Sequence, residues 1–153
     1  MNAEISIVVP TLNCQQDLKI LVNSLEKQTL QPTEVIISDS SNNSHIKNYL
    51  DSYKGTLNII YLKNNRSFPG EKRNEGAKIA KYYLIAFLDV ATIPKPNWLN
   101  DSFQKIVEGY DVVFGATKYN QSNYMQALIR AATYGRIAHE SSPGSLIKRD
   151  KFF

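Results

Sequence analysis

The sequence predicts an α/β fold: a single domain in which a mainly parallel β-sheet carries helices on both faces. Two observations predict it. The chain contains short apolar runs rich in β-branched residues, and these runs alternate with amphipathic segments at helical spacing. Strands that alternate with helices of this length imply right-handed crossovers and parallel neighbours. The 153 residues suffice for one domain with a sizeable core.

The first half of the chain alternates strand and helix. ISIVVP (residues 5–10) is a continuous apolar run, which is typical of a strand buried on both faces. Residues 16–28 carry apolar side chains at positions i, i+3, i+4 and i+7, and this spacing predicts a helix. EVIIS (34–38) predicts a second strand, residues 45–53 a short helix with one apolar stripe, and LNIIYL (57–62) a third strand.

The second half continues the alternation. GEKRNEGAKIAK (70–81) predicts a loop that turns into a helix, and YLIAFLD (83–89) predicts the fourth strand. An amphipathic helix is expected over residues 97–109, closed by its final glycine. The remaining expected elements are a strand over 111–119, a helix over 124–137 and a short strand over 144–149.

The composition narrows the class of protein. A hydrophobic content of 42% and a charged content of 21% are ordinary for a globular protein. The formal charge of +4 suits an anionic ligand such as a phosphorylated metabolite, although a mildly basic surface explains it equally well. No basic block is interleaved with aromatic residues, so nucleic acid is not an expected partner. The single cysteine, Cys14, excludes an internal disulfide framework and a multi-cysteine zinc site, and we expect it to be a buried or half-buried, inert thiol.

The sequence also predicts a cytoplasmic location. The N-terminus lacks the basic start and the long apolar stretch of a signal peptide. No apolar run approaches the ~20 residues that are needed to cross a bilayer. Any contact with a membrane is therefore expected to be peripheral and to involve regions outside this sequence.

Small polar or acidic residues follow the predicted strands at the points where the strands end. They include Pro10, Thr11 and Asn13 after the first strand, Asp39 after the second and Asp89 after the fourth. In open α/β sheets, ligands bind at the carboxyl ends of the strands. Asn, Asp and Ser are common in turns in any case, and a single such residue needs no other explanation. Two acids that both directly end apolar runs favour a binding site.

Two cations lie near the start of the helix that is expected after residue 70. The free N–H groups and the dipole of a helix start favour anions, and Arg73 can hold a phosphate with two hydrogen bonds. Lys72 is expected to be solvated in the first turn instead. Acids for a sugar or base, together with a cation for phosphate, describe a nucleotide site. The sequence contains neither a P-loop nor a G-x-G-x-x-G motif, which disfavours ATPases and dinucleotide-binding enzymes.

Four segments resemble a known family. ISIVVPTLN, EVIISDSSNN, KRNEGAKIAKYYLIAFLD and IPKPNWL are similar, in order and spacing, to the donor-binding half of inverting family-two glycosyltransferases with the GT-A fold. The resemblance runs from about Ile5 to Leu99, and GSLIKRDKFF resembles a later landmark of the family. It implies a GT-A-like, Rossmann-like domain over residues 1–153 that is cut off at its C-terminal end.

The resemblance implies roles for the residues at the strand ends. Pro10 and Thr11 would line the nucleobase and ribose pocket, with Asn13 beside them among the donor-binding residues. Asp39 would accept a hydrogen bond from the base, typically uracil, so Asp39→Ala is expected to abolish nucleotide binding and leave the fold intact. Asp89 would be the first acid of the D-x-D motif, next to the donor ribose and to a bound Mg²⁺ or Mn²⁺.

The resemblance also places a diphosphate near the helix start, and one departure from the family's pattern affects the metal. Arg73 would lie near the diphosphate, and Asn74 and Gly76 would shape that turn. The second acid of the D-x-D motif is replaced by Ala91, which offers no oxygen ligand to a hard cation. Asp89 is thus expected to be one half of a metal site or, on the plainest interpretation, only the residue that starts a turn.

The expected function is transfer of a sugar from a nucleotide diphosphate donor, UDP-linked, to a glycan or lipid-linked acceptor in polysaccharide biosynthesis. Single displacement with inversion needs a general base to take the proton of the acceptor hydroxyl. The family supplies that base further along the chain, and the earlier candidates here are His139 and Glu140, whose default interpretation is an exposed loop pair without a role. A nucleotide-sugar-binding module without catalysis and an α/β interaction domain are the alternatives.

Overall fold

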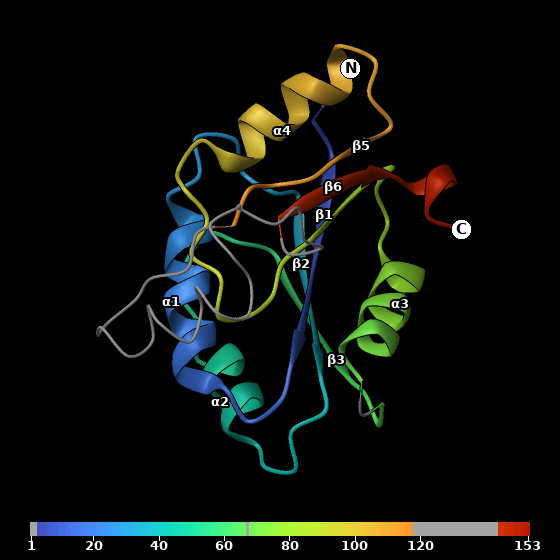
Figure 1. Ribbon diagram of the computed structural model, residues 1–153. Coiled ribbons are helices and arrows are strands. Elements are labelled where there is room, and N and C mark those ends of the chain that lie inside the picture. Colours follow the sequence, from blue (N-terminus) through green and yellow to red (C-terminus); the bar gives the residue numbers. More distant parts are fainter. Residues whose placement is uncertain (1–2, 67, 118–143) are drawn as a thin grey trace, which may run out of the picture.

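The computed structural model describes residues 3–66, 68–117 and 144–153 and shows the predicted α/β architecture (Figure 1). Within this part of the chain, the strands form a six-stranded sheet in the order β3-β2-β1-β4-β6-β5. The strands are β1 (Ile5–Thr11), β2 (Glu34–Asp39), β3 (Ile59–Lys63), β4 (Leu84–Phe87), β5 (Val112–Val113) and β6 (Ser145–Lys148). The first four are parallel, whereas β6 is antiparallel to β4 and β5 is antiparallel to β6. The sheet is therefore mainly parallel, as predicted.

The strand order reverses beside β1. From β1 the chain adds β2 and then β3 on one side, and the next strand, β4, lies on the other side of β1. Such a reversal leaves a crevice at the carboxyl ends of the two neighbouring strands, and ligands of open α/β sheets bind there. The topology thus marks the ends of β1 and β4 as the expected position of a site.

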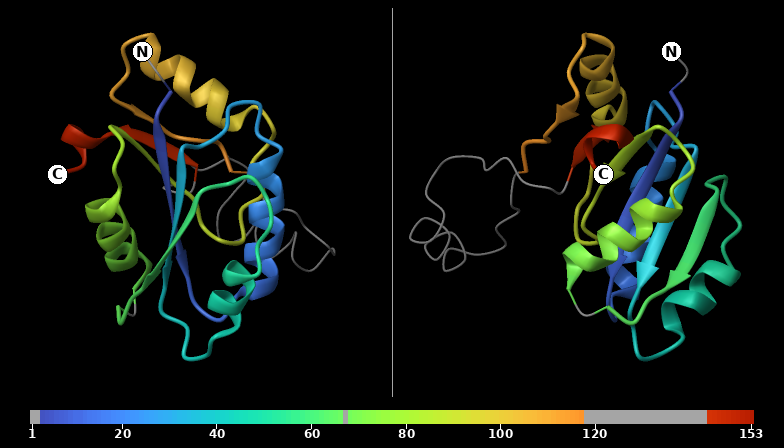
Figure 2. Two further views of the ribbon diagram at one scale, coloured as in Figure 1. Left: turned by 180° about the vertical axis from the view of Figure 1, so that it is seen from behind. Right: turned by 90° about the vertical axis from the view of Figure 1, so that its right-hand side faces the viewer.

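Helices cover both faces of the sheet (Figure 1, Figure 2). They are α1 (Gln15–Glu26), α2 (His45–Asp51), α3 (Pro69–Ile79) and α4 (Trp98–Val107), and a 3₁₀-helix follows β6 at Arg149–Lys151. Buried side chains of α1, α2 and α4 share one hydrophobic core with the sheet, and those of α3 belong to a second, smaller core on the other face. No helix within the described residues is long and apolar enough to span a membrane.

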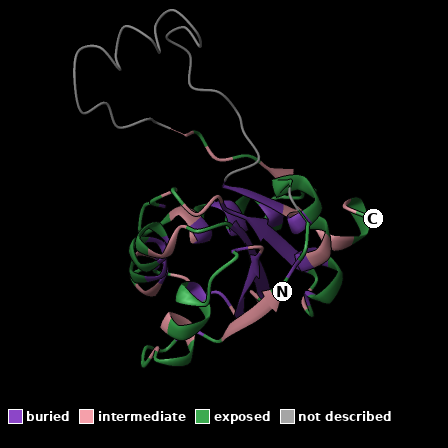
Figure 3. Ribbon diagram, turned by 90° about the horizontal axis from the view of Figure 1, so that it is seen from below, coloured by how far each residue is buried: buried purple, intermediate pink, exposed green. Residues whose placement is uncertain are grey.

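The two cores follow from the alternation of side chains along the central strands. Ile5, Ile7 and Val9 of β1 face the larger core, whereas Val8 faces the smaller core under α3. Successive side chains of a strand point to opposite faces, so a strand that is covered on both sides needs a continuous apolar run. Seen from below, the buried strands fill the centre of the molecule and the helices surround them (Figure 3).

Helix α3 packs closely on the sheet at Gly76. A Cβ atom at this position would lie 2.4 Å from Cγ1 of Val8 and 3.6 Å from Cγ2 of Ile36. Since Cβ atoms do not approach other atoms to within 3.0 Å, only glycine permits this spacing. Gly76 therefore sets the depth at which α3 lies on β1. The resemblance implies that Gly76 shapes a turn at the diphosphate, whereas in the structure it lies within α3.

The strand expected over 111–119 is shorter among the described residues. Regular pairing with β6 is confined to Val112–Val113. Beyond it, the N–H of Gly115 donates to the carbonyl of Gly144 at 3.0 Å, and a Cβ at Gly115 would lie only 2.9 Å from that oxygen. The backbones at Gly115 and Gly144 thus approach each other closely where the sequence predicts that the strand continues. The helix expected over 124–137 lies outside the described residues.

Candidate functional site

The predicted acids lie at the same edge of the sheet, at the carboxyl ends of its parallel strands. Thr11 and Asp39 are direct partners at the carboxyl ends of β1 and β2. Asp89 lies two residues after Phe87, the last residue of β4, on the other side of β1. Because these strands are parallel neighbours, the three residues surround the point where the strand order reverses.

The carboxylate of Asp39 is fully buried and accepts hydrogen bonds on both oxygens. Its Oδ1 accepts from the Thr11 hydroxyl at 2.9 Å, from the Ser41 N–H at 3.1 Å and from the Ser41 hydroxyl at 2.5 Å. Its Oδ2 accepts from the Tyr61 hydroxyl at 3.0 Å. Burial of a charge is costly unless it is hydrogen-bonded, so these donors hold the carboxylate in place. A carboxylate has about four acceptor sites, and the spare capacity therefore lies on Oδ2.

Burial and the hydrogen bond to Asp39 raise the pKa of Tyr61 to about 12. The unfolded chain, with a tyrosine pKa of 10.0, loses this proton first as the pH rises. The stability that Tyr61 contributes is thus fully present below about pH 10 and is lost towards pH 12. We expect Tyr61→Phe to reduce this alkaline loss by about 1 kcal/mol after allowance for solvent screening, measured by urea unfolding across that range. Equal losses in variant and wild type would contradict the assignment.

Lys72 is buried, which corrects the expectation of a solvated first turn. Only 3% of its surface is exposed, and its Nζ donates to the Thr11 carbonyl and to the Ser40 hydroxyl, each at 3.0 Å. Burial lowers the pKa of Lys72, and the neighbouring carboxylate of Asp39 opposes that shift. Lys72 precedes Gly76 by four residues, so both lie on the face of α3 that covers the sheet. It therefore joins α3 to the ends of β1 and β2.

Arg73, the next residue on α3, points to the end of β4. Its Nη2 forms an ion pair with Oδ1 of Asp89, and the two side chains are 18% and 42% exposed. Phe87, the last residue of β4, belongs to the core under α3, and the ion pair shows that the Asp89 carboxylate lies on the same side of the sheet. The turn after β4 is closed by the Asp89 carbonyl, which accepts from the N–H of Thr92 at 2.9 Å. The Asp89 carboxylate is thus directed to Arg73 and is more than a turn residue.

The described residues do not fit a divalent cation beside Asp89. Mg²⁺ and Mn²⁺ take oxygen ligands, about six for Mg²⁺. Ala91 is exposed and offers none, and one oxygen of Asp89 is engaged by Arg73. Across residues 3–66, 68–117 and 144–153, no group of three or more His, Cys, Asp or Glu side chains could hold a metal ion.

The other predicted residues of β1 lie at the same edge. Pro10 is buried and pairs with Ser38 of β2. Asn13 is exposed, has a positive φ of 52°, and donates its N–H to the Ser41 hydroxyl at 2.7 Å. The loop after β1 is thereby joined to the loop that follows Asp39.

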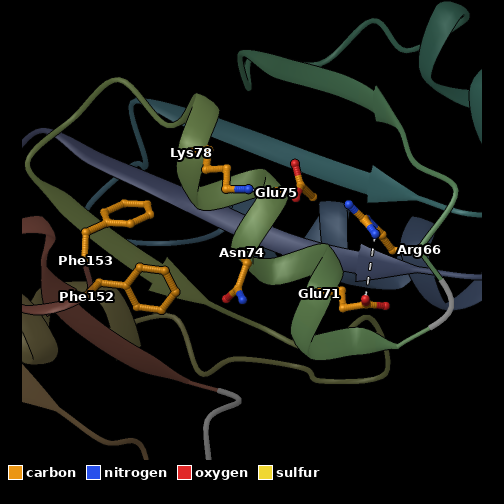
Figure 4. A pocket seen from close by; sticks show the side chains of 7 residues that line it. All are labelled: Arg66, Glu71, Asn74, Glu75, Lys78, Phe152 and Phe153. Atoms are coloured by element: carbon orange, nitrogen blue, oxygen red, sulfur yellow. Dashed lines mark hydrogen bonds and ion pairs between the residues drawn. The ribbon is translucent and has the colours of Figure 1, made fainter.

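Asn74 is not brought to this cluster. It shares the outer face of α3 with Glu71 and Lys78, and together they line a hollow of about 500 Å³ that Phe152 and Phe153 border (Figure 4). This hollow lies on the outer face of α3, whereas the polar groups described above lie at the strand ends. The general-base candidates at positions 139 and 140 fall outside the described residues.

The thiol of Cys14 fits the expectation of an inert group. Cys14 directly precedes α1 and is half-buried. Burial raises the pKa of its thiol, which lowers the population of the reactive thiolate near neutral pH.

The sequence analysis did not predict the contacts of three residues in the hydrogen-bond network at the strand ends. Ser41 stands two residues after Asp39, the spacing at which an aspartate side chain bonds back to its own loop, so it could have been found. The burial of Lys72 could have been found from its helical spacing to Gly76. Tyr61 carries no such signal, because its contact with Asp39 depends on the register between β2 and β3.

Comparison with known sequences places the chain in a family. A family profile described as Glycosyl transferase family 2 matches residues 6–152. The hyaluronan synthase of Pasteurella multocida is 30% identical over 125 residues, which cover 79% of this chain and 13% of that protein. The GalNAc(5)-diNAcBac-PP-undecaprenol beta-1,3-glucosyltransferase of Campylobacter jejuni is 30% identical over 115 residues, 73% of this chain and 37% of that protein. The chain thus spans well under half the length of these relatives.

Solved structures of S. aureus TarS share the fold. One superposes with a TM-score of 0.68 and 26% identity over 95% of this chain and 47% of that chain. TarS in complex with UDP-GlcNAc gives a TM-score of 0.67 and 28% identity over 78% of this chain and 36% of that chain. The GT-A-like fold is thereby confirmed. Because the family profile covers nearly the whole sequence, this chain belongs to glycosyl transferase family 2.

Proposed function

We propose that the chain binds the nucleoside diphosphate of a sugar donor, a UDP-sugar, at the carboxyl ends of β1, β2 and β4. One observation carries this proposal: a buried, hydrogen-bonded Asp39 lies at the same sheet edge as the Arg73–Asp89 ion pair. An acceptor for a base and a cation for phosphate are thus presented together where the strand order reverses. The UDP-GlcNAc complex of TarS, a similar structure, supports this class of donor.

In this proposal Asp39 recognises the base by accepting a hydrogen bond from it. Uracil presents its N3–H as a donor, and Oδ2 of Asp39 has capacity to accept it, since Tyr61 is the donor that the structure places there. Pro10, Thr11 and Asn13 border the base and the ribose. Asp39 is 0% exposed, so the Tyr61 hydroxyl must give way when the base binds.

Arg73 holds the diphosphate in this arrangement, and Asp89 lies beside the ribose. Arginine binds phosphate oxygens with a planar set of N–H donors, and Arg73 lies in the second turn of α3, near the helix end that favours anions. Asn74 has a place only at the rim of this site, because its side chain lines the outer hollow of α3.

We further propose that residues 1–153 form the donor-binding part of an enzyme that transfers the sugar with inversion to a glycan or lipid-linked acceptor. The name of the C. jejuni relative specifies an undecaprenol-linked acceptor, which supports the lipid-linked class. The general base, with His139 and Glu140 as candidates, a cytoplasmic location and a peripheral membrane contact stay predictions from the sequence. A Mg²⁺ or Mn²⁺ ion is the cofactor that the family resemblance implies, and the donor set at Asp89 argues against it.

A second candidate function is nucleotide-sugar binding without transfer. The observation that favours it is Ala91, which replaces the second acid of the D-x-D motif. Release of UDP from UDP-GlcNAc by the chain, at a rate that Asp89→Asn lowers, would exclude this candidate.

Calorimetric titration of UDP and CDP into wild type and Asp39→Asn tests the base assignment. In the variant, the amide oxygen can keep the Thr11 and Ser41 donors, and the amide nitrogen takes the position of Oδ2, where it can donate to the Tyr61 hydroxyl. That nitrogen would oppose the N3–H of uracil but suit the N3 acceptor of cytosine. We expect wild type to prefer UDP and the ratio of UDP to CDP affinity to fall by about tenfold or more in the variant.

Two results would contradict the proposal. If wild type binds no UDP, the assignment of a donor site is wrong. If the ratio of UDP to CDP affinity is unchanged in Asp39→Asn, Asp39 does not recognise the base. Tyr61→Phe is the matched control, because it removes a donor to the same oxygen without presenting a new one to the base. It should keep the preference for UDP.

A further inference from the structure

We propose that Arg73, in place of a divalent cation, supplies the positive charge beside Asp89, so that the chain binds a nucleoside diphosphate without a metal. The inference rests on the proposed donor site and concerns how that site neutralises the phosphates. Three observations carry it: the ion pair itself, the loss of the second acid, and the unused hydrogen-bonding capacity of the guanidinium.

The ion pair places a fixed cation beside the single acid of the motif. Arg73 is only 18% exposed and reaches Oδ1 of Asp89; it lies one helical turn before Ala77, which belongs to the core under α3. α3 is anchored here by Lys72, whose Nζ bonds to the ends of β1 and β2, and by the close packing of Gly76 on Val8. The backbone that carries Arg73 is thus held on both sides.

The same contact disfavours a metal ion. A divalent cation at Asp89 would have to displace the guanidinium or share the carboxylate with it, and two like charges at one site repel each other. With Ala91 in place of the second acid, the motif keeps one carboxylate, and one of its oxygens is already engaged. Beside Asp89 the described residues therefore offer an internal cation and no second carboxylate.

Arg73 retains donors for an anion. A guanidinium carries five N–H donors in a planar fork, and the contact with Asp89 uses Nη2. Among the described residues, Nε of Arg73 is buried without a hydrogen-bond partner. Leaving a buried donor unsatisfied is unfavourable, and a phosphate oxygen at this point would satisfy it and bring the charge that the guanidinium neutralises.

The test is calorimetric titration of UDP and UMP, each in EDTA and in excess Mn²⁺. For wild type we expect UDP affinities within about threefold of each other in the two conditions. Arg73→Met should weaken UDP in EDTA by about tenfold or more and UMP by much less, because the second phosphate is what Arg73 holds. Lys78→Met is the matched control: it removes the same charge from the exposed face of α3, and UDP affinity should stay within about twofold.

A reciprocal variant tests the exchange directly. Arg73→Met combined with Ala91→Asp removes the internal cation and restores the second carboxylate, so UDP binding should become dependent on Mn²⁺ by about tenfold or more. Wild-type binding that strengthens by that factor in Mn²⁺ would overturn the inference and leave the donor site standing. Wild type that binds no UDP in either condition would overturn the donor site as well, so the two failures are distinguishable.

Discussion

Replacing Asp39 with alanine is expected to lower the free energy of unfolding by about 4 kcal/mol. The substitution removes the acceptor of the Thr11 hydroxyl, of the Ser41 N–H and hydroxyl, and of the Tyr61 hydroxyl. Each buried donor left without a partner costs about 1–3 kcal/mol. It also removes the carboxylate whose charge favours the protonated form of the buried Lys72. From the sequence alone this substitution is expected to spare the fold, whereas the buried hydrogen bonds of Asp39 lead us to expect a loss of stability.

The matched control for Asp39→Ala is Asp51→Ala. Asp51 is an exposed acid on α2 whose partner is Lys47, one helical turn away at 2.6 Å. Surface pairs of this kind contribute less than about 1 kcal/mol, so the control should unfold close to wild type. Urea unfolding of the two variants measures the difference. Equal stability of both would show that the hydrogen bonds to Asp39 contribute little.

Gly76→Ala is expected to destabilise the fold by about 2 kcal/mol, although alanine is the better helix former by about 1 kcal/mol. The added methyl group would lie 2.4 Å from Cγ1 of Val8, whose side chain is fully buried in the centre of the sheet. A β-branched side chain in a packed core has few rotamers to adopt, so α3 itself must move outward. Because Lys72 and Arg73 lie on the same helix, UDP affinity should fall together with stability.

The same helix offers a control for this prediction. Gly70 lies in the first turn of α3, and a Cβ there would meet nothing within 4 Å. Gly70→Ala should therefore leave thermal stability unchanged or raise it slightly through helix propensity. If Gly76→Ala melts at the same temperature as Gly70→Ala, the close packing of α3 on Val8 is not what positions the helix.

Much of the fold follows from local patterns in the sequence. The continuous apolar runs of β1, β2 and β4 predict strands that are covered on both faces, and the structure buries every residue of these three strands. The apolar stripe of α1 predicts its buried face, formed by Leu18, Leu21, Val22 and Leu25. The shortness of β5 was not predictable in this way, because it depends on the close crossing of Gly115 and Gly144, which are far apart in the sequence.

The residues of the candidate site likewise fall into those whose position follows from local sequence and those whose position depends on the assembled fold. The positions of Asp39 and Asp89 at strand ends follow from the sequence, because each directly ends an apolar run. The position of Lys72 near a helix start suggested a solvated cation, whereas its helical phase relative to Gly76 places it against the sheet. The pairing of Arg73 with Asp89 depends on how α3 is rotated about its axis against the sheet and on the direction in which the chain leaves β4. Only the assembled sheet determines both.

NMR decides whether the donor site lies at the carboxyl ends of the strands or in the hollow on α3. ¹H–¹⁵N spectra of the labelled chain would be recorded during titration with UDP. We expect the largest amide shifts on Thr11, Ser41 and Arg73, which line the strand ends. Shifts centred instead on Glu71 and Phe152, which line the outer hollow, would contradict this expectation.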